Sequence, residues 1–319
     1  MIEKLQKHLD FRYKNVHMDE NSTFQYNQLI EQNYLNNFFR HLSRGMGNKF
    51  DEFEFFVFSA KGDKLPASRK LEGRNKILIF ISDELQVKPI AIATNYLAIF
   101  KAYLPDEKQC APNRIYPFPL GVVNGFESDP IVPIRNRSCS AYFVGNLNMN
   151  RVPIFIALFR YPRWVLQTLQ KRLSVTAFKK VLLLLGNSIA IKKPFKSGKI
   201  EFTPGFKQGY DIKTYSSFLR DSKIVFCPKG FHSTETFRHY EAMSAGCLVI
   251  SEKLPDTRLY RNSPIIQVDD WEEGIKVAER LLARPDEMVK LQHETIDWSD
   301  KMISSQAASE YVHTTLQNF

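Results

Sequence analysis

The feature that most constrains the fold is a regular alternation of short apolar runs with longer stretches of helical length between residues 140 and 290. The expected strands are 140–146, 179–186, 223–230, 247–251 and 263–270. A helical stretch is expected to begin at 151. Further helices are expected over 210–222, 236–246 and 271–288, and Gly246 is the stop signal of the second of these three. Strand–helix alternation of this kind predicts a parallel, doubly wound α/β sheet.

The N-terminal part shows the same signals less regularly. Residues 1–45 are expected to be helical, and 76–84 has the length and apolarity of a buried parallel strand that ends in polar residues. Pro117 and Pro119 predict an extended connector rather than a central strand over 114–123. Further expected elements are a strand at 53–60 and, within 90–104, a strand followed by a helix.

Chain length predicts two domains, because single hydrophobic cores stop growing near ~250–300 residues and this chain has 319. Residues 124–138 hold a glycine, two prolines and mixed charge without periodicity, which indicates a linker. We therefore expect an N-terminal domain over 1–125 and a C-terminal domain over 139–298. A helix at about 299–319 is expected to pack back on the first domain.

The charge balance favours acidic partners, since the net charge is +10. Lys192, Lys193, Lys196 and Lys199 form a cluster that is either a solvated loop or a contact with an anionic membrane. The four cysteines include no C-x-x-C pair, so no zinc site is expected. We expect all four to be free thiols in a reducing compartment. The opening residues do not resemble a signal peptide, and no run reaches the ~20 apolar residues of a membrane span. A cytoplasmic protein, with possible peripheral attachment at the inner face of a membrane, is the expectation.

The segment 215–251 carries the chemistry. Its strand 223–227 ends in the turn Pro228-Lys229-Gly230, and a polar loop then leads into a helix. Ligands of parallel sheets bind beyond the carboxyl ends of the strands, and free N–H groups at a helix start near Thr234 suit a phosphate. Arg238 can add a charged contact, and Glu241, three residues on, can accept hydrogen bonds from ribose. The alternative is that Arg238 and Glu241 form a surface pair.

This segment resembles the exostosin family of glycosyltransferases. The matching residues are Tyr215, Leu219, Ser222, Lys223, Phe226, Cys227, Pro228, Gly230, Thr236, Phe237, Arg238, Glu241, Ala242, Gly246, Cys247, Val249 and Ile250. Upstream, Phe143, Gly145 and Arg151 match the opening of the family pattern, and Asp270-Trp271 matches its end. The resemblance covers roughly residues 139–290 and is specific at its centre.

The resemblance implies two Rossmann-like domains that face a central cleft (GT-B). A nucleotide sugar, expected to be a uridine diphosphate sugar, would bind the C-terminal domain, and a saccharide, glycan or lipid-linked acceptor the N-terminal one. It implies that Glu241 contacts the ribose and that Arg151 and Arg238 lie near the diphosphate. The expected donor-binding residues are Gly145, Arg151, Lys229, Gly230, His232, Ser233, Thr234, Thr236, Arg238 and Glu241. For Lys229 and His232, simple exposure on a loop is the alternative.

An inverting mechanism is favoured, because Ser233 stands eight positions before Glu241 where retaining enzymes carry a second glutamate. Such a mechanism needs one general base, and Asp83 and Glu84 are candidates because they follow the strand 76–81. Asp83 is alternatively the cap of a following helix. No cofactor or metal is expected, and the acidic pairs 269–270 and 272–273 are interpreted as cap or linker carboxylates.

Two other functions compete with sugar transfer. One is a non-catalytic glycan- or nucleotide-binding protein of the same fold, which the pairing of Arg238 with Glu241 argues against. The other is a basic nucleic-acid-binding protein, but no motif supports it and the aromatic residues lie in apolar runs rather than basic ones.

Overall fold

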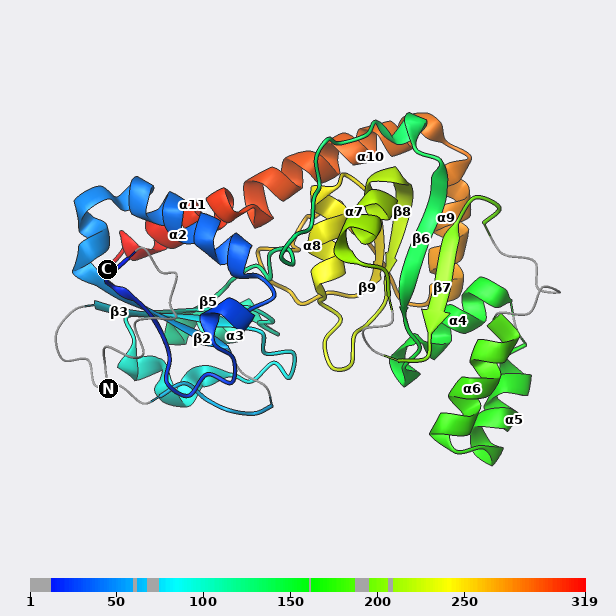
Figure 1. Cartoon of the computed structure of the whole chain (residues 1–319), viewed down its shortest axis with the longest axis horizontal. Coiled ribbons are helices and arrows are strands. Elements are labelled where there is room, and N and C mark those ends of the chain that lie inside the picture. Colours follow the sequence, from blue (N-terminus) through cyan, green and yellow to red (C-terminus); the bar gives the residue numbers. More distant parts are fainter. Residues whose placement is uncertain (1–12, 60–61, 68–74, 161, 187–194, 206–208) are drawn as a thin grey trace. The chain divides into compact units, whose positions relative to one another are not determined.

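The chain folds into two compact units, each built on a parallel five-stranded sheet. The computed structural model describes residues 13–59, 62–67, 75–160, 162–186, 195–205 and 209–319 (Figure 1). Unit 1 comprises the described parts of 1–124 together with 255–263 and 298–319, and unit 2 comprises 125–254 and 264–297. The expected α/β class with two parallel sheets is confirmed.

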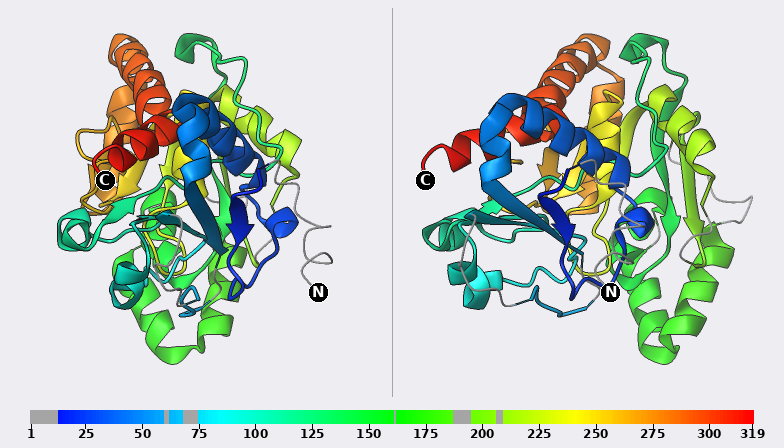
Figure 2. Two further views of the ribbon diagram at one scale, coloured as in Figure 1. Left: turned by 90° about the vertical axis from the view of Figure 1, so that its left-hand side faces the viewer. Right: turned by 60° about the vertical axis from the view of Figure 1, so that its left-hand side comes forward.

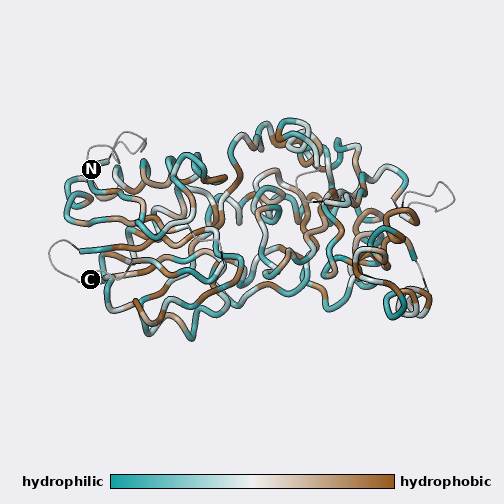
Figure 3. Tube along the Cα trace, turned by 60° about the horizontal axis from the view of Figure 1, so that its bottom comes forward, coloured by the Kyte–Doolittle hydropathy of each residue, from teal (hydrophilic) through white to brown (hydrophobic). Residues whose placement is uncertain are grey.

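The sheet of unit 1 runs in chain order. Its strands are β1 (Val16–Met18), β2 (Phe53–Ser59), β3 (Asn75–Ile81), β4 (Ala98–Lys101) and β5 (Ile115–Pro117). The central strands are apolar on both faces, as expected for parallel strands that are covered on both sides (Figure 3). The helices α2 (Gln32–Met46) and α11 (Ser305–Leu316) pack against each other and cover one face (Figure 2). The 3₁₀ helix η3 (Pro89–Asn95) and α3 (Glu107–Cys110) cover the other.

The end of the chain belongs to unit 1. After the π-helical turn η7 (Ser299–Ile303), α11 buries Ala308 and Val312 against the sheet core. The Tyr34 hydroxyl of α2 donates a hydrogen bond of 2.8 Å to the Ile303 carbonyl. Gly121 lies beside the same tyrosine with φ +75°, and a Cβ there would come within 2.4 Å of the Tyr34 ring. Position 121 therefore requires glycine, both for the backbone conformation and for the close approach to Tyr34.

Two expectations for unit 1 were wrong in detail. Residues 13–45 are not one helix: β1 and η1 (Tyr26–Gln28) precede α2, because the strand gains pairing with β2 that local propensity does not show. Within 90–104 the order is reversed, and η3 precedes β4. The expectation for 114–123 holds, because this segment forms no central strand: it contributes only the short edge strand β5, where Pro117 ends the pairing.

The sheet of unit 2 reverses its order. Its strands are β6 (Cys139–Asn146), β7 (Lys199–Thr203), β8 (Ser222–Cys227), β9 (Leu248–Glu252) and β10 (Ile266–Val268). Their spatial order is β10-β9-β8-β6-β7, so the chain changes direction between β6 and β8. Strands of a doubly wound sheet bind ligands at the carboxyl side of such a switch point. The fold therefore points to the loops that follow β6 and β8.

Helices cover both faces of this sheet. The helices α4 (Val152–Phe159), α9 (Trp271–Leu282) and α10 (Pro285–Trp298) bury apolar residues against one face. The helices α7 (Ile212–Asp221) and α8 (Phe237–Ser244) contact the other. Because α8 directly follows the loop after β8, its first turn lies at the ligand side of the sheet.

Two expectations for unit 2 were wrong. Residues 179–186 form part of the helix α6 (Val175–Gly186) rather than a strand. Leucine is unbranched at Cβ and favours helices. Phe178 and Leu182 lie four residues apart, so both are buried on one helical face, whereas Leu184 is 74% exposed. The expected C-terminal domain of 139–298 is also interrupted, because residues 255–263 pack in unit 1, where the backbone of Asp256 pairs with that of Asp106.

The expected linker is part of unit 2, and Arg137 explains why. Its side chain is 2% exposed, and its guanidinium donates to the carbonyls of Val132 (2.9 Å), Ser222 (2.6 Å) and Ala245 (2.6 Å). Ser222 and Ala245 are the C-caps of α7 and α8, whose last carbonyls have no partners within the helix. One buried arginine thus ties the linker to two helix ends.

We predict that Arg137→Met lowers the free energy of unfolding by about 3–5 kcal/mol, because several buried carbonyls lose a charged donor. Urea denaturation followed by circular dichroism measures the loss. The matched control is Arg135→Met, whose side chain is 60% exposed in a surface ion pair with Asp286. The control should cost less than about 1 kcal/mol. Equal losses for the two variants would contradict the proposed role of Arg137.

Candidate functional site

Two arginines converge at the carboxyl end of β6, beside the switch point. Arg151 ends the short 3₁₀ turn η6 (Met149–Arg151), whose cap Asn148 accepts a hydrogen bond from the Arg151 N–H. Arg238 lies in the first turn of α8. Both guanidiniums lie over the ring of Phe143, at 5.6 Å for Arg151 and 4.9 Å for Arg238. Positive charge from two elements is thereby gathered above one aromatic ring.

Hydrogen bonds fix these guanidiniums in place. Arg151 donates from Nη1 to the Asn146 carbonyl (2.9 Å) and from Nε to the Lys229 carbonyl (3.3 Å). Arg238 donates from Nη2 to the Val144 carbonyl (2.6 Å). Within the described part of the chain Arg238 forms no salt bridge, and its Nε is buried without a hydrogen-bond partner. Arg238 therefore presents a charge that a backbone carbonyl orients but does not neutralise.

Gly145 allows both arginines to approach β6. A Cβ at this position would lie 3.0 Å from Arg151 Nη1 and 3.3 Å from Arg238 Nη2. Those distances are shorter than most Cβ contacts in proteins, so a side chain would shift both guanidiniums by a few tenths of an ångström. The glycine predicted as a donor-site residue thus favours this close packing, and the three residues Gly145, Arg151 and Arg238 lie together.

Several N–H groups of the loop after β8 already donate to other groups of the protein. The Gly230 N–H donates to the Ser233 carbonyl (2.8 Å), and the Glu235 N–H donates to the Ser233 hydroxyl (3.0 Å). At the cap of α8, the Thr236 N–H donates to Nδ1 of His239 (3.2 Å). The expectation of several free amides near Thr234 is therefore corrected for Glu235 and Thr236. Positive potential here comes from the guanidiniums and the helix dipole instead.

Glu241 lies in the interior of the unit rather than on its surface. It is 3% exposed, and the Tyr215 hydroxyl of α7 donates to its Oε2 at 2.6 Å. Burial, and then the neighbouring Glu241 carboxylate, raise the pKa of Tyr215, so the hydroxyl stays protonated and donates. The alternative of an exposed Arg238–Glu241 surface pair is wrong, because Glu241 is buried. A buried carboxylate beside the first turn of α8 suits a neutral donor such as a hydroxyl.

His239 is a neutral link between α8 and the sheet. Its Nε2 lies 2.8 Å from the Ser251 hydroxyl, which donates onward to the Cys227 carbonyl (3.2 Å). Nε2 therefore carries the proton, and Nδ1 accepts from Thr236. Burial lowers the pKa of His239 to about 3, although the backbone bond at Thr236 acts in the opposite direction and the charge of Arg238 lowers the pKa further.

The remaining predicted donor residues line the same loop with different exposure. His232 is exposed, Lys229 and Thr234 are half-buried, and Ser233 is buried. The Lys229 N–H donates to Oε2 of Glu252 (3.1 Å), whose Oε1 accepts from the Trp271 indole (2.6 Å). These backbone and buried contacts shape the loop, and their roles toward a donor stay a prediction.

The candidate base Asp83 lies in a buried ion pair of unit 1. Its Oδ2 accepts from Nζ of Lys101 (2.8 Å) and from the Val87 N–H (2.8 Å). Both side chains are at most 1% exposed, and Lys101 also donates to the Ala102 carbonyl (2.9 Å). Asp83 does not cap a helix, because residues 84–88 form no helix before η3. Glu84, the other candidate, is half-buried in the same turn.

A residue that sequence reasoning missed is Glu31, the N-cap of α2. It is 2% exposed, and its Oε1 accepts from the Ser82 hydroxyl (2.7 Å) at the carboxyl end of β3. Among the described residues its Oε2 has no hydrogen-bond partner. Burial raises the pKa of Glu31, while the Ser82 bond acts in the opposite direction.

Some of the residues that sequence reasoning missed could have been found from the sequence, and others could not. Phe143 and Tyr215 belong to the family pattern, so their roles as a ring platform and as a partner of Glu241 could have been inferred from it. Asn150 donates from Nδ2 to the carbonyls of Gly230 and Phe231, both at 2.9 Å, and joins the loops after β6 and β8. Nothing local marks Asn150 or Glu31, because only folding brings their partners close.

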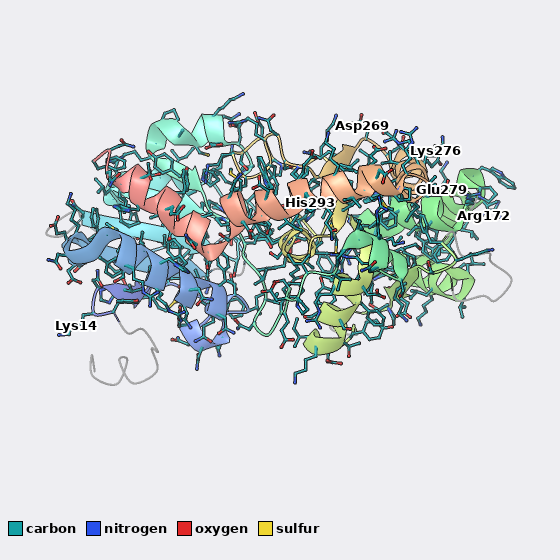
Figure 4. All side chains as sticks on the ribbon, turned by 90° about the horizontal axis from the view of Figure 1, so that it is seen from above. Lys14, Arg172, Asp269, Lys276, Glu279 and His293 are labelled. Carbon is teal, nitrogen blue, oxygen red and sulfur yellow. The ribbon has the colours of Figure 1, made fainter. Side chains whose placement is uncertain are left out.

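Asp270 is a cap carboxylate, as interpreted from the sequence: it caps α9 by accepting from the Glu273 N–H (2.9 Å). Asp269 lies at the surface (Figure 4) and forms an ion pair of 2.6 Å with Lys253. The four cysteines are buried free thiols, as expected. No helix in the described ranges has both the length and the apolarity to cross a membrane.

Among known proteins, only solved structures match this chain. No protein-family model matches the chain, and no curated protein sequence matches it. HepE from Anabaena, in complex with UDP, is 9% identical over 95% of this chain and 99% of that chain, with a TM-score of 0.49. Sucrose-phosphate synthase from Thermosynechococcus elongatus is 10% identical over 94% and 82% of the two chains, with a TM-score of 0.45. These values are too low to assign a family or a function, and the resemblance to exostosins stays a prediction.

We predict that the stability of unit 2 falls below about pH 6.5, because the unfolded chain then protonates His239 and the native state does not. The pKa is lowered in the folded state, so the loss continues down to about pH 3, at up to about 1.4 kcal/mol per pH unit. Urea denaturation of His239→Gln at each pH should show a flatter profile. His293→Gln, on the exposed side of α10, is the control and should leave the profile unchanged.

Proposed function

We propose that the protein transfers a sugar from a nucleoside diphosphate sugar to a saccharide or glycan acceptor, with the donor bound by unit 2. The observation that carries the proposal is the convergence of Arg151 and Arg238 above Phe143, at the carboxyl end of β6. A diphosphate carries negative charge, which complements two fixed guanidiniums. Each guanidinium can bind phosphate oxygens through two parallel hydrogen bonds. Glu241 would then accept hydrogen bonds from ribose hydroxyls.

This arrangement supplies what departure of a nucleoside diphosphate needs. Negative charge develops on the leaving diphosphate, and charges that are already oriented stabilise it without reorganisation. Backbone carbonyls of residues 144, 146 and 229 hold the two guanidiniums before any donor binds. Lys229, His232, Ser233 and Thr234 stay candidates for donor contacts. The GT-B arrangement of the two units and the identity of the donor as a uridine nucleotide are parts of the proposal.

The base of the proposed inverting reaction would come from unit 1. Asp83 also has one oxygen, Oδ1, without a hydrogen-bond partner among the described residues, but its carboxylate is held in a buried ion pair with the Lys101 ammonium and accepts from a backbone N–H. We infer that Glu31 is the better candidate, since burial raises its pKa, its carboxylate pairs with no ammonium among the described residues, and its buried Oε2 has no hydrogen-bond partner there. Glu84 is retained as the comparison residue. The cytoplasmic setting belongs to the proposal and awaits its own test.

We predict that Arg238→Met weakens the binding of both UDP and inorganic pyrophosphate by about 10- to 100-fold, because a charged hydrogen bond is worth about 1.5–3 kcal/mol. Glu241→Gln should weaken UDP about tenfold and leave pyrophosphate unchanged, because only the ribose contact is altered. Isothermal titration calorimetry measures both ligands.

The control for these variants is Arg160→Met, an exposed arginine of unit 2 that pairs with Glu279 (2.7 Å). A wild-type affinity for UDP in a correctly folded Arg238→Met protein would refute the donor site. Binding of UDP without any transfer or hydrolysis of a UDP-sugar would favour the non-catalytic alternative.

We predict that Glu31→Gln lowers kcat by about 10²- to 10⁴-fold, the usual range for the loss of a general base. The folded-state pKa of Glu31 is raised, so its ionised form destabilises the protein above the unfolded pKa. Replacement by glutamine should therefore preserve or increase stability near pH 7. Steady-state rates and melting temperatures are measured together.

Two variants of the neighbouring turn serve as controls. Glu84→Gln should retain activity, and Asp83→Asn should mainly destabilise the fold by leaving Lys101 buried without its counter-charge. Near-normal turnover by Glu31→Gln, combined with loss of turnover in the stable Glu84→Gln protein, would transfer the role to Glu84.

A further inference from the structure

The crossover between β6 and β7 contains more chain than the sheet needs. A parallel crossover requires a dozen or more residues, commonly one helix, whereas this one spans residues 147–198 and holds α4, α5 (Arg163–Arg172) and α6. α4 packs in the core against α9. α5 packs on α6, and α6 reaches the body of the unit through Phe178 and Leu182. We call α5 and α6 together the helical hairpin.

The hairpin carries the three most exposed large apolar side chains of the described residues. Leu184 is 74% exposed, Trp164 is 72% exposed and Val175 is 58% exposed. The other exposed large apolar residues reach at most 52%. The surface of a soluble protein normally avoids several exposed large apolar side chains in one region, and such a group marks a site of interaction.

The charge of the chain is concentrated in the same region. Residues 130–200 hold 13 of the 44 Lys and Arg residues and none of the 34 Asp and Glu residues. The rest of the chain, with 31 basic and 34 acidic residues, is slightly acidic. On the hairpin itself Lys171, Arg172 and Lys180 are exposed. The net basic character of the protein therefore originates in this segment.

Each helix carries one large apolar and one basic side chain on the same exposed face, together with a threonine. In α5, Trp164, Thr168 and Arg172 are exposed at a spacing of four residues, which places them on one face. In α6, Thr176, Lys180 and Leu184 are exposed at the same spacing. Such faces, with tryptophan and leucine beside lysine and arginine, are typical of helices that lie in a membrane interface.

We propose that the helical hairpin docks the protein on an anionic lipid surface. Its exposed apolar side chains would enter the boundary between headgroups and acyl chains, and Lys171, Arg172 and Lys180 would contact anionic headgroups. The absence of acidic residues from 130–200 complements that surface in charge. Nucleic acid fits less well, because Leu184 and Val175 have no role against phosphate. The proposal does not depend on the reaction that unit 2 catalyses.

The test is flotation of the full chain with vesicles of phosphatidylcholine alone or with 30% phosphatidylglycerol, at low and at 0.5 M salt. We expect binding to the anionic vesicles only, reduced by salt. Trp164 is the one largely exposed tryptophan, since Trp271 is buried and Trp298 half-buried, so binding should shift tryptophan emission to the blue.

Variants separate the two contributions. Lys171→Gln, Arg172→Gln and Lys180→Gln together should weaken partitioning on the order of 100-fold, at about fivefold for each charge. Trp164→Ser with Leu184→Ser should reduce binding and remove the blue shift. Matched controls are Lys276→Gln, exposed on α9 (Figure 4), and Ile90→Ser, and both should bind as the wild type does.

Three outcomes would overturn the proposal. One is the absence of binding to anionic vesicles by the wild type. Another is equal loss of binding in the control variants. The last is hairpin-dependent binding of DNA, or hairpin-dependent dimerisation in light scattering, without any lipid binding, which would identify a different occupant.

Discussion

The proposed site depends on the close approach of two arginines to the carboxyl end of β6. Gly145 has no side chain, so the guanidiniums of Arg151 and Arg238 reach the strand and share the ring of Phe143. The two positive charges repel each other, and carbonyls of β6 and of the β8 loop hold the guanidiniums in place against that repulsion. A bound anion would relieve the strain of like charge, which is why the arrangement favours a diphosphate ligand.

The surroundings of the site are rigid for reasons that are separate from binding. Arg137 joins the chain ahead of β6 to the ends of α7 and α8, and His239 joins the start of α8 to Ser251 on β9. Both ends of α8 are thus fixed to the sheet. Arg238 and Glu241, which α8 carries, are held in orientation before a ligand arrives, and such preorganisation lowers the cost of binding.

Much of unit 2 was predictable because its signals are local. The apolar runs of β6, β8 and β9, the stop at Gly246 and the helix of Arg238 follow from periodicity and turn chemistry. The failures have physical causes as well. The leucines of 181–185 suit a helix as well as a strand, and the length of the run could not separate the two. In unit 1, β1 exists because β2 offers it partners, which is a non-local effect.

The sequence by itself determined the parallel α/β class and the loop after β8, since each rests on residues close along the chain. Arg238 and Glu241 were chosen through the resemblance to a family, and their roles toward a ligand stay a proposal. Only the tertiary structure decided that Glu241 is buried against Tyr215, that Asp83 is bound to Lys101 and that Glu31 lies beside Ser82. These pairs join residues from separate elements. Burial and charge pairing depend on every neighbour that folding brings together, and a linear pattern does not record them.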